Sequence, residues 1–307
     1  MHEPPRLLKL RLRLEFEGSA FCGWQMQAPD LIPQVDGAEN FSENFQSNSS
    51  HLPSVQGVIE NALGTLLRRE ASHRVIVQGC GRTDAGVHAR EFFCHFEIFE
   101  HEMSLTDEAM ERFRYGLNCI INGPIAITHL QKVHASFHSL HDVSSKIYCY
   151  RILLRRAKPT LDAANCWWIP RVLSKEMIHL EALRSGLSSL EGCHDFRAFT
   201  ASKTSVKSTV RRILKTDLKV VPLGVDRESG VFLELRFEGE GFLKHQVRNM
   251  VGTLMDLAQS KISLDSFISL FQAENAKNRI EAGYCAPPQG LCLEKVIYRA
   301  SQAEQAP

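Results

Sequence analysis

Residues 8–16 read Leu-Lys-Leu-Arg-Leu-Arg-Leu-Glu-Phe, so apolar and charged side chains alternate without a break. Because successive side chains of a strand point to opposite faces of a sheet, this stretch predicts a strand with one buried face and one charged face. The same period recurs at residues 92–98 and 231–238 and predicts two further strands. The other expected helices and strands are assigned in the segments between and after these three strands.

Between these strands, apolar residues at helical spacing predict helices, the first of them capped by Ser54. Helices are expected at residues 55–69, 105–117, 175–188, 243–259 and, briefly, from 264, and strands at residues 74–79, 125–133, 147–154, 209–221 and 292–298. Strands and helices therefore mix without strict β-α-β alternation, and the order in the first half recurs in the second. We predict an α+β fold of two pseudo-duplicated, ferredoxin-like or RRM-like halves, residues 6–142 and 143–299, whose antiparallel sheets flank a central active-site cleft.

The bulk properties are those of an ordinary globular protein. The chain has 307 residues, of which 44% are hydrophobic and 23% charged. No apolar run is long enough for a membrane helix, and no targeting signal is evident, so we expect a cytoplasmic protein without a membrane partner. Nine scattered cysteines without a CxxC pair predict reduced thiols; the alternative, a metal site, lacks the usual ligand spacing. Residues 28–53 contain no Lys or Arg and predict a flexible, acidic surface insertion.

A net charge of +1 does not indicate nucleic-acid binding by itself, but basic residues gather locally. Two clusters stand out: Arg151, Arg155, Arg156 and Lys158, and then Lys203, Lys207, Arg211, Arg212, Lys215 and Lys219. Each is either a solvated face or an RNA contact, and the pattern alone leaves both open.

The segment most informative about chemistry is residues 81–89, Gly-Arg-Thr-Asp-Ala-Gly-Val-His-Ala, between two expected strands. Its glycines and Asp84 fit a tight structural turn, which is the ordinary interpretation of an Asp in a loop. Turn formation does not explain why Arg82 and His88 crowd the same loop, and loops held by strands often carry catalytic groups. His88 is either a substrate-binding residue or a hydrogen-bonding group of the loop itself.

This loop resembles the catalytic loop of the TruA family of tRNA pseudouridine synthases. Other segments agree with the family in the same order along the chain: residues 18–25 (Gly-Ser-Ala-Phe-Cys-Gly-Trp-Gln), 55–57 (Val-Gln-Gly), 146–151 (Lys-Ile-Tyr-Cys-Tyr-Arg), 194–196 (His-Asp-Phe) with Phe199, 247–252 (Val-Arg-Asn-Met-Val-Gly) and 290–291 (Gly-Leu). The resemblance spans residues 8–298, with residues 28–53 as an addition.

The resemblance implies that Asp84 is the catalytic nucleophile and that Arg248 is its ion-pair partner. It also implies that Tyr148 stacks on the target base and that Arg82 helps to flip the base out of the RNA. An exposed helix charge at Arg248 and a core tyrosine at Tyr148 are the structural alternatives. Tyr150 points to the same strand face as Tyr148 and competes with it; the family pattern selects Tyr148.

The family's activity is the isomerisation of uridine to pseudouridine in tRNA at anticodon stem-loop positions 38, 39 and 40, by a homodimer without a cofactor or metal. The same chemistry on another RNA, and a non-catalytic RNA-binding module, are the alternatives. The chain departs from the family pattern at Glu17, at Phe92 and at Ser139-Leu140, where the family usually has Asp, often Gln, and an arginine, respectively. These departures affect substrate details rather than the reaction. The insertion at residues 28–53 is expected to point away from bound RNA, because it would repel phosphate.

Overall fold

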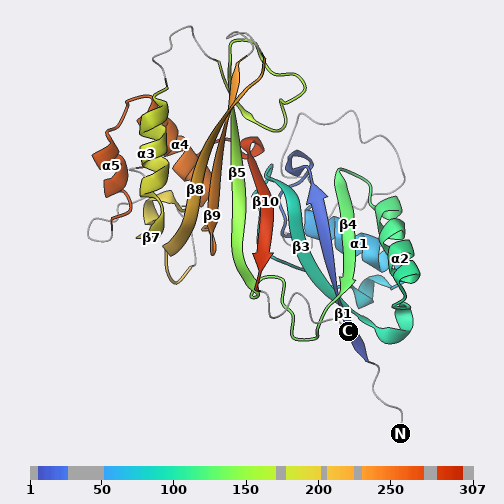
Figure 1. The fold of residues 1–307 in the computed structure, drawn as a ribbon. Helices are drawn as coiled ribbons and strands as arrows, with labels where there is room; N and C mark the ends of the chain where they lie inside the picture. Colours follow the sequence, from blue (N-terminus) through green and yellow to red (C-terminus); the bar gives the residue numbers. More distant parts are fainter. Residues whose placement is uncertain are drawn as a thin grey trace. The chain divides into compact units, whose positions relative to one another are not determined.

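Helices pack against mostly antiparallel strands in both halves of the chain, which confirms the predicted α+β class (Figure 1). The computed structural model describes residues 6–26, 52–170, 178–201, 206–224, 230–272 and 282–299. The chain divides into two compact units, the first made of residues 1–143 with 298–307 and the second of residues 144–297. The cleft expected between the two halves stays a prediction.

The first unit has the element order strand, helix, strand, strand, helix, strand. Its elements are β1 (Leu7–Phe16), α1 (Val55–Leu66), β2 (Gln78–Gly79), β3 (His88–Phe99), α2 (Asp107–Ile120) and β4 (Ile125–Lys132), with short 3-10 turns at Gly18–Ala20, Ala71–His73 and Glu100–Glu102. β1 lies between β3 and β4, and β2 pairs with β3, all antiparallel. The alternation over residues 8–16 is confirmed, since the apolar side chains of this stretch are buried. Ser54 caps α1 by accepting a hydrogen bond from the backbone N–H of Gly57.

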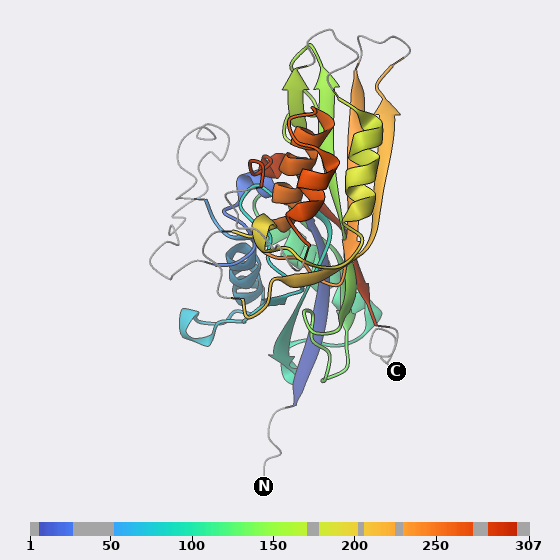
Figure 2. The same cartoon turned by 90° about the vertical axis from the view of Figure 1, so that its left-hand side faces the viewer.

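The second unit repeats this arrangement with additions. Its elements are β5 (Val143–Arg155), β6 (Trp167–Pro170), α3 (Leu180–Ser189), β7 (Gly192–Asp195), β8 (Val210–Pro222), β9 (Val231–Gly239), α4 (Gln246–Ala258), α5 (Leu264–Ser269) and β10 (Leu291–Tyr298), with 3-10 turns at Arg197–Phe199 and Pro288–Gly290. The sheet order is β10-β5-β9-β8-β7, and β6 pairs parallel with β5. If β5, β8, β9 and β10 are matched to β1, β2, β3 and β4, both units have the order 4-1-3-2, as the duplication predicts. α3, α4 and α5 pack together beside this sheet (Figure 2).

Several expected boundaries need correction. The strand expected at residues 74–79 is limited to Gln78–Gly79, because the backbone N–H and C=O of Val77 bond to side chains of α1 instead of a strand. The helix expected from residue 243 begins at Gln246, after His245 adopts a left-handed conformation with a φ of 64°. β6 and β7 were not expected. Most of the 28–53 insertion lies outside the described residues, as do the first residues of the expected helix at 175–188.

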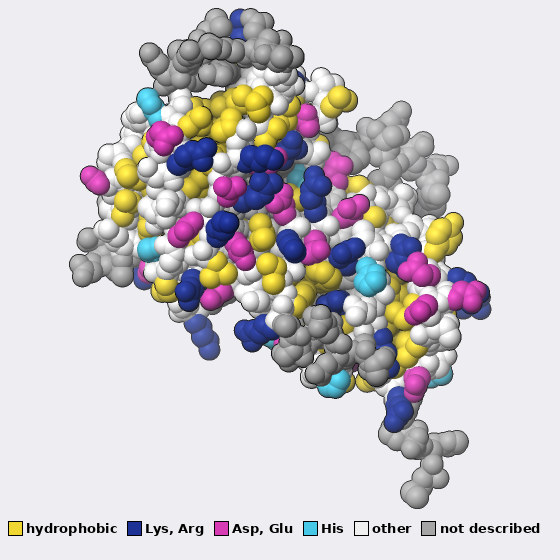
Figure 3. Space-filling model, viewed as in Figure 1, with side chains coloured by type: hydrophobic (Ala, Val, Ile, Leu, Met, Phe, Trp, Pro, Cys, Tyr) yellow, Lys and Arg dark blue, Asp and Glu magenta, His cyan; other side chains and the backbone are white. Residues whose placement is uncertain are grey.

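One face of the second unit's sheet carries interleaved positive and negative side chains (Figure 3). Arg236 bonds to Glu294 at 2.9 Å and to Glu234 at 3.0 Å, and Arg151 lies 3.6 Å from Glu234. The Arg151 guanidinium also covers the ring of Phe232 at 4.1 Å. Arg151 of the first basic cluster is therefore engaged within the sheet face.

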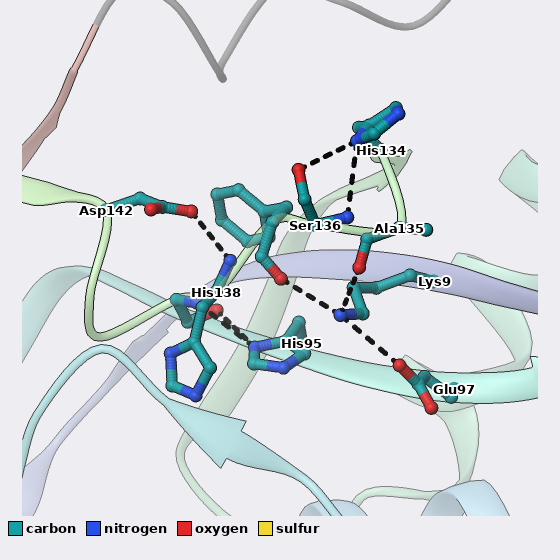
Figure 4. Close-up of polar contacts among 10 residues, drawn as sticks. Lys9, His95, Glu97, His134, Ala135, Ser136, His138 and Asp142 are labelled. Atoms are coloured by element: carbon teal, nitrogen blue, oxygen red, sulfur yellow. Dashed lines mark hydrogen bonds and ion pairs between the residues drawn. The ribbon is translucent and has the colours of Figure 1, made fainter.

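The connection between β4 and β5 is anchored on the charged face of the β1–β3 pair (Figure 4). Lys9 of β1 donates to the carbonyl oxygens of Ala135 and Phe137, at 2.6 Å and 3.1 Å. The backbone N–H of Ser139 donates to Nδ1 of His95 at 3.1 Å, and the two side chains are 3.0 Å apart. Both of these side chains are buried, so this connection is a packed part of the first unit.

Candidate active site

The loop of residues 81–89 follows β2 and leads into β3. The backbone N–H of Val87 donates to the carbonyl oxygen of Asp84 at 3.2 Å, and Gly86 has a φ of 79°, so the loop turns tightly at its centre. Asp84 is half-buried, Arg82 is exposed and Thr83 is buried. The turn therefore holds its carboxylate between core and solvent, which is where a nucleophile needs to lie.

The segment after β1 clamps this loop. Gly23 forms an isolated antiparallel bridge with Asp84, and the backbone N–H of Trp24 donates to the carbonyl oxygen of Thr83 at 3.2 Å. Gly23 has a φ of 113°, and a Cβ there would lie 2.6 Å from the Thr83 oxygen. Only glycine combines this conformation with such a close approach. The backbone around Asp84 is therefore fixed by a part of the chain some 60 residues away in sequence.

His88 is 6% exposed, and its Nδ1 accepts a hydrogen bond from the backbone N–H of Gly18 at 3.1 Å. In the neutral ring this bond places the proton on Nε2. A Cβ at Gly18 would lie 2.0 Å from the carbonyl oxygen of Val87, so the two segments are in direct contact here. This geometry favours the hydrogen-bonding interpretation of His88, and its role in substrate binding stays a prediction.

A buried carboxylate network from α1, which sequence reasoning missed, holds the segment before this loop and the end of the segment that clamps it. Glu60, 3% exposed, accepts hydrogen bonds from the Val77 backbone N–H and the Gln56 side chain, both at 3.0 Å, and pairs with Arg74 at 2.6 Å. Gln56 also accepts from the backbone N–H of Met26 at 3.1 Å. The only sequence signal was a glutamate on the apolar side of a helix.

The structure separates the two competing tyrosines of β5. Tyr150 is fully buried, and its hydroxyl donates to the carbonyl oxygen of Pro287 at 2.7 Å. Burial raises the pKa of Tyr150 and keeps this hydroxyl protonated. Tyr148 is half-buried and packs edge-on against Phe242, with ring centroids 5.1 Å apart. Of the two rings, only that of Tyr148 has substantial exposure for stacking on a base.

Arg248 is half-buried on α4 and exchanges two hydrogen bonds with one residue of the segment before β10. Its Nε donates to the carbonyl oxygen of Ala286 at 2.7 Å, and the backbone N–H of Ala286 donates to the carbonyl oxygen of Arg248 at 3.1 Å. The Nε bond fixes the plane of the guanidinium, which a simple solvated helix charge would not require. Asp84 belongs to the first unit, whereas Arg248 and Tyr148 belong to the second, so the ion pair stays a prediction.

The second basic cluster is only partly described, because Lys203 lies outside the described residues. Arg211 donates to the carbonyl oxygens of Ser208 and Val210, at 3.0 Å and 2.6 Å, so its guanidinium orders the start of β8. Among the described residues, no cluster of three His, Cys, Asp or Glu side chains is arranged to hold a metal ion. No helix in this part of the chain has the length and apolarity of a membrane span, and none of the nine cysteines, all of which are described, forms a disulfide.

Comparison with known proteins decides the family. A tRNA pseudouridine synthase A of Citrifermentans bemidjiense is 34% identical over 292 residues, which cover 94% of this chain and 97% of the relative. The chain belongs to the tRNA pseudouridine synthase family. Residues 187–299 match a family model described as tRNA pseudouridine synthase. Relatives named tRNA pseudouridine synthase A from Geobacter sp. and Geobacillus sp. are each 34% identical over 94% of the chain and 98% of their own length.

Pseudouridine synthases are isomerases, and membership confirms the enzyme class predicted from residues 81–89. The departures from the family pattern have defined places in the structure. Phe92 is buried and stacks on Trp24, the residue whose backbone N–H holds the 81–89 loop, with ring centroids 4.2 Å apart. Glu17 is exposed and accepts a hydrogen bond from Ser19, while Leu140 is 44% exposed. None of these side chains belongs to the 81–89 loop.

Proposed function

We propose that this chain isomerises uridine to pseudouridine in tRNA, with Asp84 as the nucleophile. The family supplies the reaction class, and its relatives are named for tRNA. The observation that carries the residue assignment is the clamp on the backbone at Asp84, which is bridged to Gly23 and held at the preceding Thr83 carbonyl by the backbone N–H of Trp24. A half-buried carboxylate on such a fixed backbone suits covalent catalysis, because little backbone reorganisation is needed at the moment of reaction.

The reaction breaks the bond between ribose C1′ and uracil N1, forms a bond from C1′ to uracil C5, and releases the proton from C5, while N1 takes up a proton from solvent. It is redox-neutral, so a carboxylate, a base-stacking group and a proton acceptor suffice. Asp84 acts at the ribose or the base, or promotes a glycal intermediate. Arg248 stabilises the ionised carboxylate in a desolvated pocket. Tyr148 stacks on the uracil, and its phenol assists proton transfer at C5.

The target uridine has to leave the RNA stack before it reaches Asp84, at a cost of a few kcal/mol. Arg82 is exposed on the same loop, and its planar guanidinium suits stacking in the vacated space. From the resemblance described above, we propose positions 38, 39 and 40 of the anticodon stem-loop as the targets and a cytoplasmic homodimer as the active form. Recognition by shape and backbone contacts would allow one enzyme to modify neighbouring positions.

The decisive test measures the release of tritium from tRNA labelled at uracil C5. We expect release by the wild-type protein, and none by Asp84→Asn, with tRNA binding retained. A matched control is Asp107→Asn, which makes the same charge change at an exposed position of α2 and should leave release unchanged. Release that persists in Asp84→Asn contradicts the nucleophile assignment.

The identity of the RNA is tested with unlabelled substrates. Individual tRNAs and other structured RNAs are incubated with the protein, and the pseudouridines are mapped by position. Modification at 38, 39 and 40 is expected. Modification of another RNA would move the same chemistry to a different substrate, and binding without any modification would leave an RNA-binding module.

A further inference from the structure

The segment that leads into β10 is fastened along one side of α4 in the second unit. The backbone N–H of Gly283 donates to the Thr253 hydroxyl at 2.9 Å, and Ala286 exchanges its two hydrogen bonds with Arg248. Four residues on from Ala286, the side chain of Tyr150 fills the space next to Gly290, where a Cβ would lie 2.6 Å from the ring. The backbone of residues 283–290 is therefore ordered by both α4 and β5.

Tyr284 lies between the anchors at Gly283 and Ala286. Its carbonyl is in contact with α4, since a Cβ at Gly252 would lie 1.8 Å from the Tyr284 oxygen. Its ring meets Trp167 edge-on, with centroids 5.4 Å apart and planes at 82°. Even so, 47% of Tyr284 is exposed to solvent. The ring is thus held by a fixed backbone and an aromatic neighbour while a large part of it stays open.

The charges near this ring do not oppose the approach of a polyanion. Burial, with a smaller contribution from Asp256, raises the pKa of Tyr284 to about 12, so the phenol is neutral at physiological pH. Asp256 is itself paired with Lys261 at 3.1 Å, which offsets its charge. Neither group would repel a phosphodiester backbone strongly at this position.

We propose that Tyr284 is a stacking platform for an unpaired base of the RNA substrate, next to the segment that orients Arg248. This inference rests on the proposed function, and it concerns a second base of the RNA, in addition to the target uracil that stacks on Tyr148. A base stacked on an aromatic side chain raises affinity by roughly 5- to 100-fold, without requiring a particular sequence. Because the ring is already ordered, little conformational freedom is lost on binding.

Two observations single out Tyr284. Among the large hydrophobic side chains that are exposed in the described part of the chain, the aromatic ones are Tyr115 and Tyr284. Tyr284 is also two residues from Ala286, whose carbonyl accepts a hydrogen bond from Arg248, so its ring belongs to the same ordered segment that holds this arginine. Tyr115 lies on α2 in the first unit and provides a matched control.

The test compares Tyr284→Ala, Tyr284→Phe and Tyr284→Trp in tritium release from the same labelled tRNA and in direct tRNA binding. We expect Tyr284→Ala to raise KM and the dissociation constant at least about fivefold, with kcat within about twofold of wild type. Phe and Trp retain a ring and should restore both constants, and Tyr115→Ala should change neither.

The outcomes separate this proposal from the proposed function. Wild-type tRNA affinity in Tyr284→Ala, with an active wild-type enzyme, overturns the platform and leaves the isomerase intact. A lower kcat with unchanged KM also overturns it, because the ring would then only support the segment that holds Arg248. A change in oligomeric mass by light scattering with unchanged tRNA affinity identifies a protein contact and overturns it as well. If the wild type releases no tritium but Tyr284→Ala still binds tRNA more weakly than the wild type, the platform is supported and the isomerase function is refuted.

Discussion

Replacing His95 by asparagine tests whether a buried, neutral imidazole sets the acid limit of the first unit's stability. His95 is 4% exposed, and its Nδ1 accepts the backbone N–H of Ser139 at 3.1 Å (Figure 4). The Oδ1 atom of asparagine occupies nearly the same position and accepts the same hydrogen bond, but the amide does not titrate. The substitution therefore removes the proton equilibrium while it keeps the anchor of the segment between β4 and β5.

The magnitude follows from the pKa of His95, which burial lowers from 6.5 to about 4; His138 and Lys9 add to the effect, and Asp142 opposes it. The unfolded chain binds a proton at His95 near pH 6.5, whereas the native protein does so only near pH 4. Unfolding is therefore favoured progressively as the pH falls between these values, and the stabilisation is complete above pH 6.5. At about 1.4 kcal/mol per pH unit, the loss across this window is about 3 kcal/mol.

The assay is urea unfolding of the full chain, followed by the fluorescence of Trp24, at several pH values between about 7 and 4.5. Trp167→Phe and Trp168→Phe remove the other two tryptophans, both of which lie in the second unit. In this background His95→Asn should lose about 2.5 kcal/mol less than the parent between about pH 7 and pH 4.5. His141→Asn, at an exposed neighbouring position, leaves the burial of His95 intact and should retain most of the parent's loss. Equal pH dependence in parent and His95→Asn would refute the reasoning.

Three other changes test the site. Tyr150→Phe deletes the hydroxyl that holds the segment bonded to Arg248. The kcat for tritium release at saturating tRNA should therefore fall up to about tenfold, with KM unchanged. An unchanged kcat would show that this hydroxyl does not act through the arginine. Gly23→Ala forces a Cβ toward the Thr83 carbonyl at a positive φ. It should lower the free energy of unfolding in urea by about 2 kcal/mol and remove most of the activity. Wild-type activity in this variant would contradict the clamp. Glu60→Ala leaves buried donors without their acceptor and should lower the free energy of unfolding by about 2–3 kcal/mol, a loss that thermal melting would also detect.

Much of the fold was predictable because its signals are local. The period of two in β1 and the helical spacing in α1 are properties of neighbouring residues, and burial follows directly from them. The matching element order in the two halves was also readable, and the strand orders agree with it. β6 and β7 were not predicted because each has four residues, too few to show the alternation of a strand.

The sequence by itself determined the family and the residues worth testing, since the 81–89 loop and its ordered satellites carry that information in short stretches. Only the tertiary structure decided which groups hold those residues in place. Glu60 on α1 bonds to Val77, Gly23 bridges to Asp84, and the Ala286 carbonyl fixes Arg248, each across a separation of 17 to 61 residues. A hydrogen bond depends on atoms meeting within about 3 Å, and for partners far apart in the chain that distance is set by folding rather than by local pattern.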